Sequence, residues 1–523
     1  MFLIMSAAYV DVELQSEFGL IPPALLPLGN KRLFQHQNNI IPKGAKKYIS
    51  LPESYRLTSM DTQWLKDNGF TIISAPDGLS LGASLVASIS LIDEPIEKNL
   101  HVLFGDTLIT ELPLGNDVIA ISKIDDNYNW STLNNSFNSF SLSKKQLSNE
   151  VVCGYFKFSV PRQLVKCITQ NHWDFIEGLN SYNDLKNLTP ILTDKWLDFG
   201  HVNTYYRSKA KFTTQRAFNE LIITPEWIEK SSNNDIKIKA EANWFSELPA
   251  EMRNYIPQYM GSKDIQGKFS YRLEYLHHTA LNELYVFSEL PPVVWRNIFE
   301  SCFSFIKCCQ KNHLSSKSVY SSINELFGEK TRSRLTDFCI ERNISIDDKW
   351  LFEGEEITLK DILVTSAEWL PIKSTASTVM HGDFCFSNIL YDFRANRIKT
   401  IDPRGINYKN DFTIFGDIRY DLAKLSHSVL GMYDWIIAGN YQVDISNNNI
   451  TLKIDGQKKQ QEVQQLFIDI IESKFDLSPR NLYAMQIQLF LSMLPLHADD
   501  TKRQDALFAN AFRLYKILKG FNK

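Results

Sequence analysis

The residues of this 523-residue chain that are best suited to chemistry are Asp383, Asn388 and Asp402. Asp383 belongs to the sequence His381-Gly382-Asp383, and Asp402 follows an alternating stretch, Arg397–Ile401, that predicts a strand. Phosphoryl transfer from ATP needs one carboxylate to orient the attacking hydroxyl, and an amide and a second carboxylate to hold Mg²⁺ against the phosphates. The spacing of these residues indicates that chemistry, with ATP and Mg²⁺ as cofactors.

Two charged residues upstream fit the same chemistry. Lys230 follows two apolar stretches, Phe218–Ile223 and Trp227–Glu229, that predict a strand hairpin, and a helix is expected over Ile236–Leu248. Lys230 could contact the α- and β-phosphates, and Glu241 on the helix could hold this lysine as an ion pair. The residues that could form other pairs instead are Glu229, Lys237 and Lys239.

The segment around Asp383 resembles the aminoglycoside phosphotransferase and choline kinase family, which has a protein-kinase-like fold. The match consists of His-Gly-Asp, four residues, Asn, and then a strand that ends in Asp. The resemblance implies that Asp383 is the catalytic base and that Asn388 and Asp402 are Mg²⁺ ligands. His381 would belong to the catalytic loop and brace it, and Asp421 would cap a helix or brace the loop.

By the same resemblance, the backbone of Glu274 and Leu276 would hold the adenine, because the predicted strand Phe269–Leu276 runs into a hinge there. An ordinary strand end is the alternative interpretation. The first hairpin of the family would fall on Ser208–Arg216, which contains no glycine. We therefore expect no glycine-rich loop over the phosphates.

Residues 1 to about 208 alternate short apolar runs with turn and helix signals, which is typical of an α/β domain. A carboxylate, Asp106, directly follows one of the apolar runs, and the carboxyl ends of strands are where open α/β sheets place ligands and metals. Helices are expected to begin near Met60 and Leu81. The predicted strands are Phe2–Ser6, Thr71–Ser74, His101–Phe104 and Gly154–Phe158.

Five segments of this part of the chain form a recognisable pattern: Phe2–Ala8, Pro22–Leu33, Leu81–Leu85, Gly105-Asp106 and Trp196–His201. In these segments the chain resembles the sugar-nucleotide nucleotidyltransferases, which join a sugar phosphate or choline phosphate to a nucleoside triphosphate. The resemblance implies that Asp106 and Asp198 bridge a Mg²⁺ ion, that the helix start at Gly82 contacts the nucleotide, and that CTP or another triphosphate is bound.

The triphosphate loop departs from the pattern of that family. After the first strand the family has a glycine-rich loop that ends in arginine, whereas Ala8–Gln15 contains neither residue and carries Asp11 and Glu13. Lys31 and Arg32 could compensate for a lysine that the family has and this chain lacks, although they belong to a different segment. Either the domain is an active nucleotidyltransferase, or it is an inactive domain that binds a sugar nucleotide or serves as an architectural partner.

The composition fits a soluble globular protein, with 44% hydrophobic and 22% charged residues. A formal net charge of −4 gives no basic face for nucleic acid, and no segment predicts stable membrane insertion. The seven scattered cysteines predict neither a zinc site nor a disulfide framework, so free buried thiols are expected. We expect a cytoplasmic protein with a long surface loop over Asn127–Asn149. The sequence does not determine the oligomeric state.

The chain is therefore expected to be a bifunctional fusion. Residues 1–208 would form an α/β nucleotidyltransferase-like domain with a Rossmann-like mixed sheet, residues 209–290 the kinase N-lobe, and residues 291–523 a C-lobe with acceptor-binding helices. The kinase would phosphorylate a hydroxyl of a sugar, alditol or choline-like amino alcohol. The first domain would then activate the product for capsule or other surface polysaccharide.

Three alternatives stay open at this point. Both folds could serve a non-catalytic nucleotide-sensing or regulatory scaffold, or the kinase-like domain could phosphorylate proteins. Asp499 and Asp500 could bind a polyol or an amine in the acceptor pocket, although such a pair more often caps the next helix.

Overall fold

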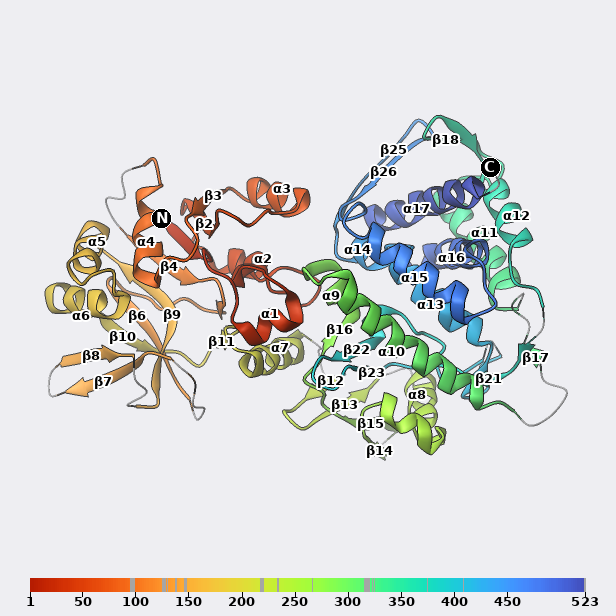
Figure 1. The fold of residues 1–523 in the computed structure, drawn as a ribbon, viewed down its shortest axis with the longest axis horizontal. Coiled ribbons are helices and arrows are strands. Elements are labelled where there is room, and N and C mark those ends of the chain that lie inside the picture. The colour runs from red at the N-terminus through yellow and green to blue at the C-terminus, as the bar shows by residue number, and fades with distance from the viewer. Residues whose placement is uncertain are drawn as a thin grey trace. The chain divides into compact units, whose positions relative to one another are not determined.

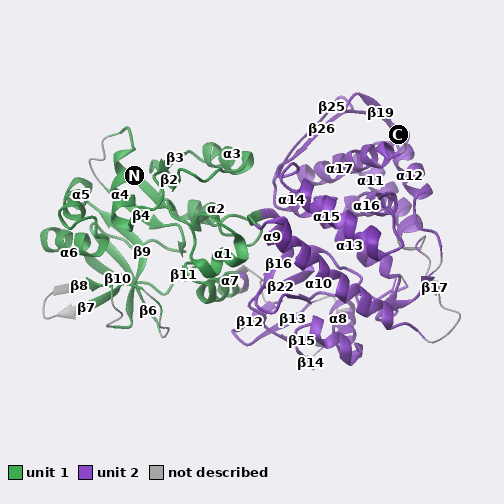
Figure 2. Ribbon diagram, viewed as in Figure 1, with its two compact units in different colours: residues 1–212, 287–289 green, residues 213–286, 290–523 purple. Residues whose placement is uncertain are grey.

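The structure, a computed structural model, describes residues 1–521 except 95–98, 125–127, 129, 137–138, 145–147, 217–220, 233–234, 266, 315–319, 322, 324, 374 and 408. The chain divides into two compact units (Figure 2). Unit 1 comprises residues 1–212 and 287–289, and unit 2 comprises residues 213–286 and 290–523.

Unit 1 is built on a mixed β-sheet with the strand order β10-β6-β9-β4-β1-β2-β3 (Figure 1). The strands at one side of this order are all parallel, and β9 runs antiparallel to both of its neighbours. The strands are β1 (Phe2–Met5), β2 (Lys47–Pro52), β3 (Phe70–Ala75), β4 (Leu100–Phe104), β6 (Val118–Lys123), β9 (Glu150–Phe158) and β10 (Thr189–Leu192). All the strands that the sequence predicts in this unit are confirmed.

Both faces of this sheet are covered by helices, which is why its central strands read as continuous apolar runs. Leu3 and Met5 of β1 join one core cluster, and Phe2 and Ile4 join the other, because successive side chains of a strand point to opposite faces. The first cluster includes residues of α4 (Leu81–Ser90), α5 (Pro161–Gln170) and α6 (Phe175–Lys186). The second includes residues of α2 (Leu33–Gln37) and α3 (Ser59–Asp67).

Two expectations about local structure in and beside this unit are wrong. The described part of Asn127–Asn149 is not a loop, because β7 (Thr132–Ser136) and β8 (Ser139–Ser143) form an antiparallel hairpin. Asn and Ser disfavour strands on their own, so pairing, rather than propensity, makes these strands. The stretch Ser208–Arg216 is not a hairpin but part of helix α7 (Val202–Arg216). The helix α7 begins before this stretch, and its apolar residues Val202, Tyr205 and Tyr206 are buried at helical spacing.

Unit 2 opens with a four-stranded antiparallel sheet of order β12-β13-β15-β14, with helix α8 (Asp235–Glu247) against β15 and β14. The strands are β12 (Leu221–Ile223), β13 (Trp227–Ser231), β14 (Tyr259–Ile265) and β15 (Lys268–Glu274). The predicted hairpin is therefore present, although residues 218–220 lie outside the described residues.

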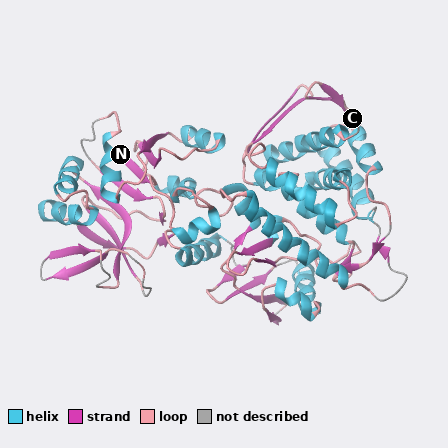
Figure 3. Cartoon of the chain, in the orientation of Figure 1, coloured by secondary structure: helices cyan, strands magenta, loops and turns pink. Residues whose placement is uncertain are grey.

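The rest of unit 2 is mostly helical (Figure 3). Helix α16 is its centre, since residues 482–493 are all buried and it contacts α11, α12, α13 and α17. The helices are α9 (Leu281–Phe287), α10 (Pro292–Lys311), α11 (Lys330–Arg342), α12 (Leu359–Glu368), α13 (Ile418–Val429), α14 (Tyr433–Ile437), α15 (Gln461–Lys474), α16 (Pro479–Met493) and α17 (Thr501–Gly520).

Short strand pairs complete the two units. In unit 1, β5 (Thr107–Ile109) pairs with β11 (Trp196–Asp198). In unit 2, the hairpin of β22 (Ile389–Asp392) and β23 (Arg397–Thr400) follows the predicted catalytic loop. The other strands of unit 2 are β16 (Thr279–Ala280), β17 (Tyr320–Ser321), β18 (Trp350–Phe352), β19 (Glu355–Ile357), β20 (Thr375–Ala376), β21 (Thr378–Val379), β24 (Phe415–Gly416), β25 (Tyr441–Ser446) and β26 (Asn449–Ile454).

All seven cysteines are free thiols and all except Cys308 are buried, as the sequence predicts. Asp500 is the N-cap of α17, where its carboxylate accepts the amide of Arg503, and Asp499 forms an ion pair with the Arg503 side chain at 2.7 Å. The capping interpretation of this acidic pair is thus confirmed. Within the described ranges, no helix combines the length and the apolar character needed to cross a bilayer.

Candidate active sites

Lys230 lies on β13, where the antiparallel sheet of unit 2 meets α8. Its Nζ is 2.9 Å from Glu241 Oε2 and 2.8 Å from Asp402 Oδ1. Tyr271 of β15 donates its hydroxyl to the same oxygen of Glu241 at 2.6 Å. Burial would lower the pKa of Lys230, but Asp402 and Glu241 together raise it above its ordinary value. Lys230 is therefore a fixed cation between two carboxylates.

The alternative partners either contact other groups or lie farther from Glu241. Glu229 is 2.6 Å from Arg272 and 3.0 Å from Lys263. Lys237 Nζ approaches Glu241 only to 3.8 Å, and the Lys239 ammonium lies over the Phe269 ring at 5.5 Å. Among the described pairings that the sequence left open for Glu241, the shortest is the ion pair with Lys230, at 2.9 Å.

The loop at Asp383 is held by two neighbouring side chains. Asp421 accepts the backbone N–H groups of His381 at 2.7 Å and Gly382 at 2.8 Å, which confirms its bracing role, while Asp417 caps α13. His381 is buried, and its Nε2 is 2.9 Å from the carbonyl oxygen of Ile401. Burial lowers the pKa of His381 to about 4, so this ring is neutral and suits bracing.

The two oxygens of the Asp383 carboxylate face different partners. Oδ2 accepts the side-chain amide of Asn388 at 3.1 Å, and Oδ1 lies 2.7 Å from Lys424 Nζ on α13. Burial would raise the pKa of Asp383, but Lys424 outweighs burial and holds it well below its usual range. The carboxylate is therefore ionised at neutral pH and able to accept a hydrogen bond from a hydroxyl group.

The β22–β23 hairpin brings Asp402 to the same place as Asn388, since the N–H of Ile401 donates to the Asn388 carbonyl at 3.0 Å. Asp402 has a φ of 57°, a left-handed backbone that is uncommon for residues other than glycine and clusters at functional sites. At Gly405, with a φ of 66°, a Cβ would lie 2.1 Å from the Ala240 carbonyl oxygen. Only glycine lets this loop pass so close to α8.

The donors on Asn388 and Asp402 are oxygens, which Mg²⁺ prefers. Throughout the described parts of the chain, no cluster of three or more His, Cys, Asp or Glu side chains is placed to hold a metal by itself. An ion at Asn388 and Asp402 would therefore need further oxygen ligands, such as the phosphates of a bound nucleotide.

The predicted hinge residues differ in how free their backbone is. The N–H of Glu274, the last residue of β15, donates to Gln258 at 2.9 Å. Leu276 makes no backbone hydrogen bond with any residue that the structure describes. Its N–H and carbonyl thus fit the expected contact with an adenine better than those of Glu274.

Three residues near Asp383 had no assigned role in the sequence analysis: Arg404, Tyr420 and Lys424. The Arg404 guanidinium donates to the Tyr420 hydroxyl at 2.9 Å and lies over its ring at 4.8 Å. Burial would raise the pKa of Tyr420, but Arg404, Lys424 and Lys330 outweigh it and lower the pKa to about 8. Arg404 follows Asp402 by two positions and Lys424 follows Asp421 by three. This proximity in sequence to the predicted site residues is the signal by which Arg404 and Lys424 could have been found.

In unit 1, the pairing of β5 with β11 brings Asp106 and Asp198 together. Thr107 is opposite Asp198, and a Cβ on Gly200 would lie 2.8 Å from Asp106 Oδ2 and 3.4 Å from Asp198 Oδ1. Burial, and then the neighbouring Asp198, raise the pKa of Asp106 to about 6. A half-buried carboxylate, Asp106, beside a buried one, Asp198, fits a divalent cation, because the two negative charges repel each other.

Different cavities flank these two carboxylates. A cavity of about 510 Å³ beside Asp198 is lined by three basic side chains, Lys123, Arg207 and Lys211. A smaller cavity of about 190 Å³ beside Asp106 has no lysine or arginine among its described lining residues, which besides Asp106 are Met5–Ala8, Pro23, Leu79, Leu81, Ser84, Phe104 and Gly105. The basic side chains of this region thus lie on the Asp198 side.

The other predicted nucleotide contacts do not line the cavity beside Asp106. Lys31 is exposed, and Gly82 lies against the carbonyl oxygen of Trp173, where a Cβ would come within 2.4 Å. The guanidinium of Arg32 is buried in an ion pair with Asp61 at 3.3 Å, so it cannot supply the missing phosphate contact.

The segment in place of the family's glycine-rich loop is a helix, α1 (Val12–Phe18). Its N-cap is Asp11, whose carboxylate accepts the amide of Leu14 at 2.8 Å. The chain's own carboxylate thus occupies the end of α1 and adds negative charge near the predicted triphosphate site.

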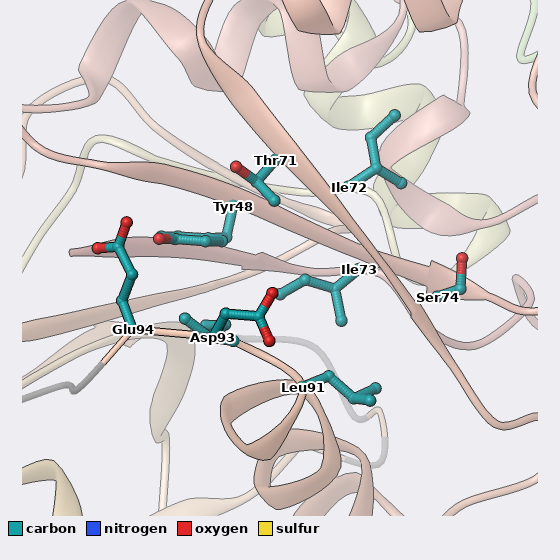
Figure 4. A pocket seen from close by; sticks show the side chains of 9 residues that line it. Tyr48, Thr71, Ile72, Ile73, Ser74, Leu91, Asp93 and Glu94 are labelled. Atoms are coloured by element: carbon teal, nitrogen blue, oxygen red, sulfur yellow. The ribbon is translucent and has the colours of Figure 1, made fainter.

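A third cavity of unit 1, of about 350 Å³, is shown in Figure 4. It is lined by Tyr48, Thr71–Ser74 and Leu91–Glu94. Because Asp93 and Glu94 precede β4 whereas Asp106 follows it, this cavity lies toward the opposite end of that strand. It is separate from the paired carboxylates.

No protein-family model and no curated protein sequence matches the chain. Among solved structures, an inositol-1-phosphate CTP transferase from T. maritima is 15% identical with a TM-score of 0.33, and the match covers 40% of this chain and 96% of that one. A UTP-bound UGPase from Acinetobacter baumannii is 14% identical with a TM-score of 0.31, over 42% and 94%. A glucosamine kinase bound to glucosamine, ADP and phosphate is 12% identical with a TM-score of 0.36, over 58% and 75%.

These likenesses concern the fold alone. The chain itself joins a unit with a mixed sheet between helices to a unit with an antiparallel sheet followed by helices. The expected fold class, an α/β domain followed by an α+β domain, is therefore confirmed, and both expected kinds of protein are among the solved structures that match.

Proposed function

We propose that unit 2 is an ATP-dependent kinase that phosphorylates a hydroxyl group of a small molecule. The observation that carries the proposal is the single constellation of Lys230, Glu241, Asp383, Asn388 and Asp402 in one unit. Its members come from a strand, a helix and two loops, and a kinase needs each of them.

In the proposed reaction, Lys230 contacts the α- and β-phosphates of ATP while Glu241 holds it in place. Asn388 and Asp402 would hold Mg²⁺, which supplies neutralisation of the phosphate charge when bound. Asp383 accepts a hydrogen bond from the acceptor hydroxyl and orients it toward the γ-phosphate. His381 and Asp421 keep the loop in place, and the backbone at Leu276 contacts the adenine.

For unit 1 we propose transfer of a nucleotide, from CTP or another triphosphate, to the phosphorylated product of unit 2. Asp106 and Asp198 would hold Mg²⁺, and the basic side chains of the cavity beside Asp198 suit a phosphorylated substrate. The acceptor would be a sugar, an alditol or an amino alcohol, and the product would be a cytoplasmic precursor of capsule or other surface polysaccharide.

A second candidate function for unit 1 is non-catalytic binding of a nucleotide sugar. It is favoured by Asp11, which caps α1 where the related fold has its phosphate loop. A carboxylate in that place repels a triphosphate. Unit 1 would then act as a scaffold or a regulator of the kinase.

Mass spectrometry tests both proposals. The protein is incubated with Mg²⁺, ATP, CTP and a pool of sugars, alditols and amino alcohols, beside the Asp106→Ala variant. If both units are active, a phosphorylated acceptor and its nucleotide-linked form appear, and the variant stops at the first. If the parent protein and the variant both yield only the phosphorylated acceptor, and the same holds when CTP is replaced by each of the other nucleoside triphosphates, unit 1 is non-catalytic. No phosphorylation of small molecules, with ATP bound, would contradict the kinase proposal.

A further inference from the structure

The two sides of the Asp383 carboxylate define two sides of the proposed kinase site. Oδ2 faces Asn388, at 3.1 Å, and Asn388 belongs to the side of the metal and the donor phosphates. Oδ1 faces Lys424, at 2.7 Å, on helix α13. The Lys424 side of the carboxylate is therefore the side that remains for the acceptor.

Positive charge gathers on that acceptor side. Besides Lys424 it includes Arg404, which donates to the Tyr420 hydroxyl at 2.9 Å. It also includes Lys330, the first residue of α11, which follows Phe327 by three positions. The Phe327 ring packs on Tyr420 with the ring centres 5.5 Å apart. The three cations are only partly buried, so their charges can reach a bound molecule.

Among the residues that the structure describes, Lys424 is the one cation of the three that is paired with a carboxylate. Arg404 donates to the Tyr420 hydroxyl, and Lys330 makes neither a hydrogen bond nor an ion pair with any described residue. Burial, and then the neighbouring cations Arg404, Arg334 and Lys424, lower its pKa, while Tyr420 opposes that shift. A partly buried lysine among other cations is costly without a counter-charge.

The nearby carboxylates do not supply that counter-charge. Asp383 is paired with Lys424, and Asp421 is turned toward the two backbone amides that it braces. Asp434 bonds to Ser428, and its burial raises its pKa to about 7. The acceptor side therefore keeps an excess of positive charge, which attracts an anionic ligand.

We propose that the acceptor of the kinase unit is an anion: a polyol or sugar whose carboxylate or phosphate group is bound by Lys330 and Arg404. Lys424 meanwhile holds Asp383 against the hydroxyl to be phosphorylated. This inference rests on the proposed kinase function and narrows it, since amino alcohols and choline-like cations would be repelled by the three positive side chains. Within the acceptors proposed above, acidic or phosphorylated sugars and alditols remain.

Kinetics on matched acceptors test the inference. The neutral, carboxylate and phosphate forms are glycerol, D-glycerate and glycerol 3-phosphate, and glucose, glucuronate and glucose 6-phosphate, with ethanolamine and glucosamine as amines. We expect kcat/KM for one anionic form to exceed that of its neutral form by about tenfold or more, as a hydrogen bond between charged groups provides. Comparison of kcat/KM between the carboxylate and phosphate forms shows which of the two anions the site binds.

Variants separate acceptor binding from donor binding. Lys330→Gln should raise the KM of the preferred acceptor by about tenfold and leave the KM of ATP within about twofold. The matched control is Lys360→Gln on α12, an exposed lysine paired with Asp347, which should change neither constant. A rise in the KM of ATP instead would assign Lys330 to the donor phosphates and overturn the inference.

Preference for neutral or amine acceptors would overturn the inference and leave the kinase proposal intact. If no acceptor in the panel reacts, acetylation of lysines by acetic anhydride gives a second readout, with inorganic phosphate and acetate as probes. Protection of Lys330, but not of Lys360, by either probe supports the anion site, and equal labelling with and without both probes refutes it. Failure to bind ATP would contradict the proposed kinase function itself.

Discussion

At the scale of single residues, Asp383 depends on Lys424. A carboxylate whose pKa is held low by a lysine is a weak proton acceptor, so in the proposed kinase reaction the main contribution of Asp383 would be to orient the acceptor hydroxyl. Asp383→Asn keeps the size of the side chain and removes the negative charge. We expect kcat to fall by about 10²–10⁴-fold while the KM of ATP changes by less than about twofold.

The assay for this variant is ADP release with the acceptor found by mass spectrometry. Asp444→Asn, at an exposed position of β25, is the matched control and should retain full activity. Substantial residual turnover of Asp383→Asn would show that Asp383 is not the group that orients the hydroxyl.

Tyr420 reports the charge of the acceptor side. Burial raises the pKa of a phenol, so a Tyr420 pKa of about 8 requires that Arg404, Lys424 and Lys330 stabilise the phenolate. The absorbance at 295 nm should show a step of one tyrosine with a midpoint near pH 8, absent in Tyr420→Phe. Arg404→Gln should move the midpoint upward, toward the ordinary value. A step that persists in Tyr420→Phe would contradict this assignment.

At the scale of elements, the β5–β11 pair forces Asp106 and Asp198 together. A carboxyl with a raised pKa stabilises the fold at low pH, and that contribution is lost as the pH rises through its folded value, about 6 for Asp106. In EDTA at pH 7.5, Asp106→Asn should therefore melt about 2–5 °C above the parent protein, and the difference should shrink at pH 5.

Magnesium should have the opposite effect on stability, because it neutralises the two carboxylates. Mg²⁺ at millimolar concentration should raise the melting temperature of unit 1 in the parent protein at pH 7.5, because it binds only the folded pair of carboxylates. The same ion should do nothing for Asp106→Asn. The control is Asp184→Asn at an exposed position of α6, which should behave as the parent protein does. A variant less stable than the parent at pH 7.5 would show that the two carboxylates do not repel each other.

The elements also show what sequence can and cannot predict. The sequence predicts a catalytic loop at Asp383 because the proposed phosphoryl transfer requires those residue types at a fixed spacing, and this prediction stays open to the tests above. The basic group of Lys330, Arg404 and Lys424 was not predictable, since its members come from different elements and only the fold brings them together. Helix α7 was mistaken for a hairpin because its expected role came from the resemblance, while its own apolar spacing is helical.

At the scale of the whole molecule, each proposed activity is contained in one unit. Asp106 and Asp198 lie in unit 1, and all residues of the kinase constellation lie in unit 2. Unit 1 has its own core clusters on the two faces of its sheet, and unit 2 is packed around α16. Neither proposed reaction therefore needs a side chain from the other unit.

This separation predicts that two inactive variants can complement each other. Asp383→Asn alone should make phosphorylated acceptor about 10²–10⁴-fold more slowly than the parent protein, and Asp106→Asn alone should accumulate it without the nucleotide-linked form. A mixture of the two proteins should restore the nucleotide-linked product, because the intermediate can leave one molecule and bind to another. The control is the double variant Asp106→Asn/Asp383→Asn on its own, which should not make the nucleotide-linked product. If the mixture fails while each variant keeps its remaining activity, the intermediate passes only within one chain.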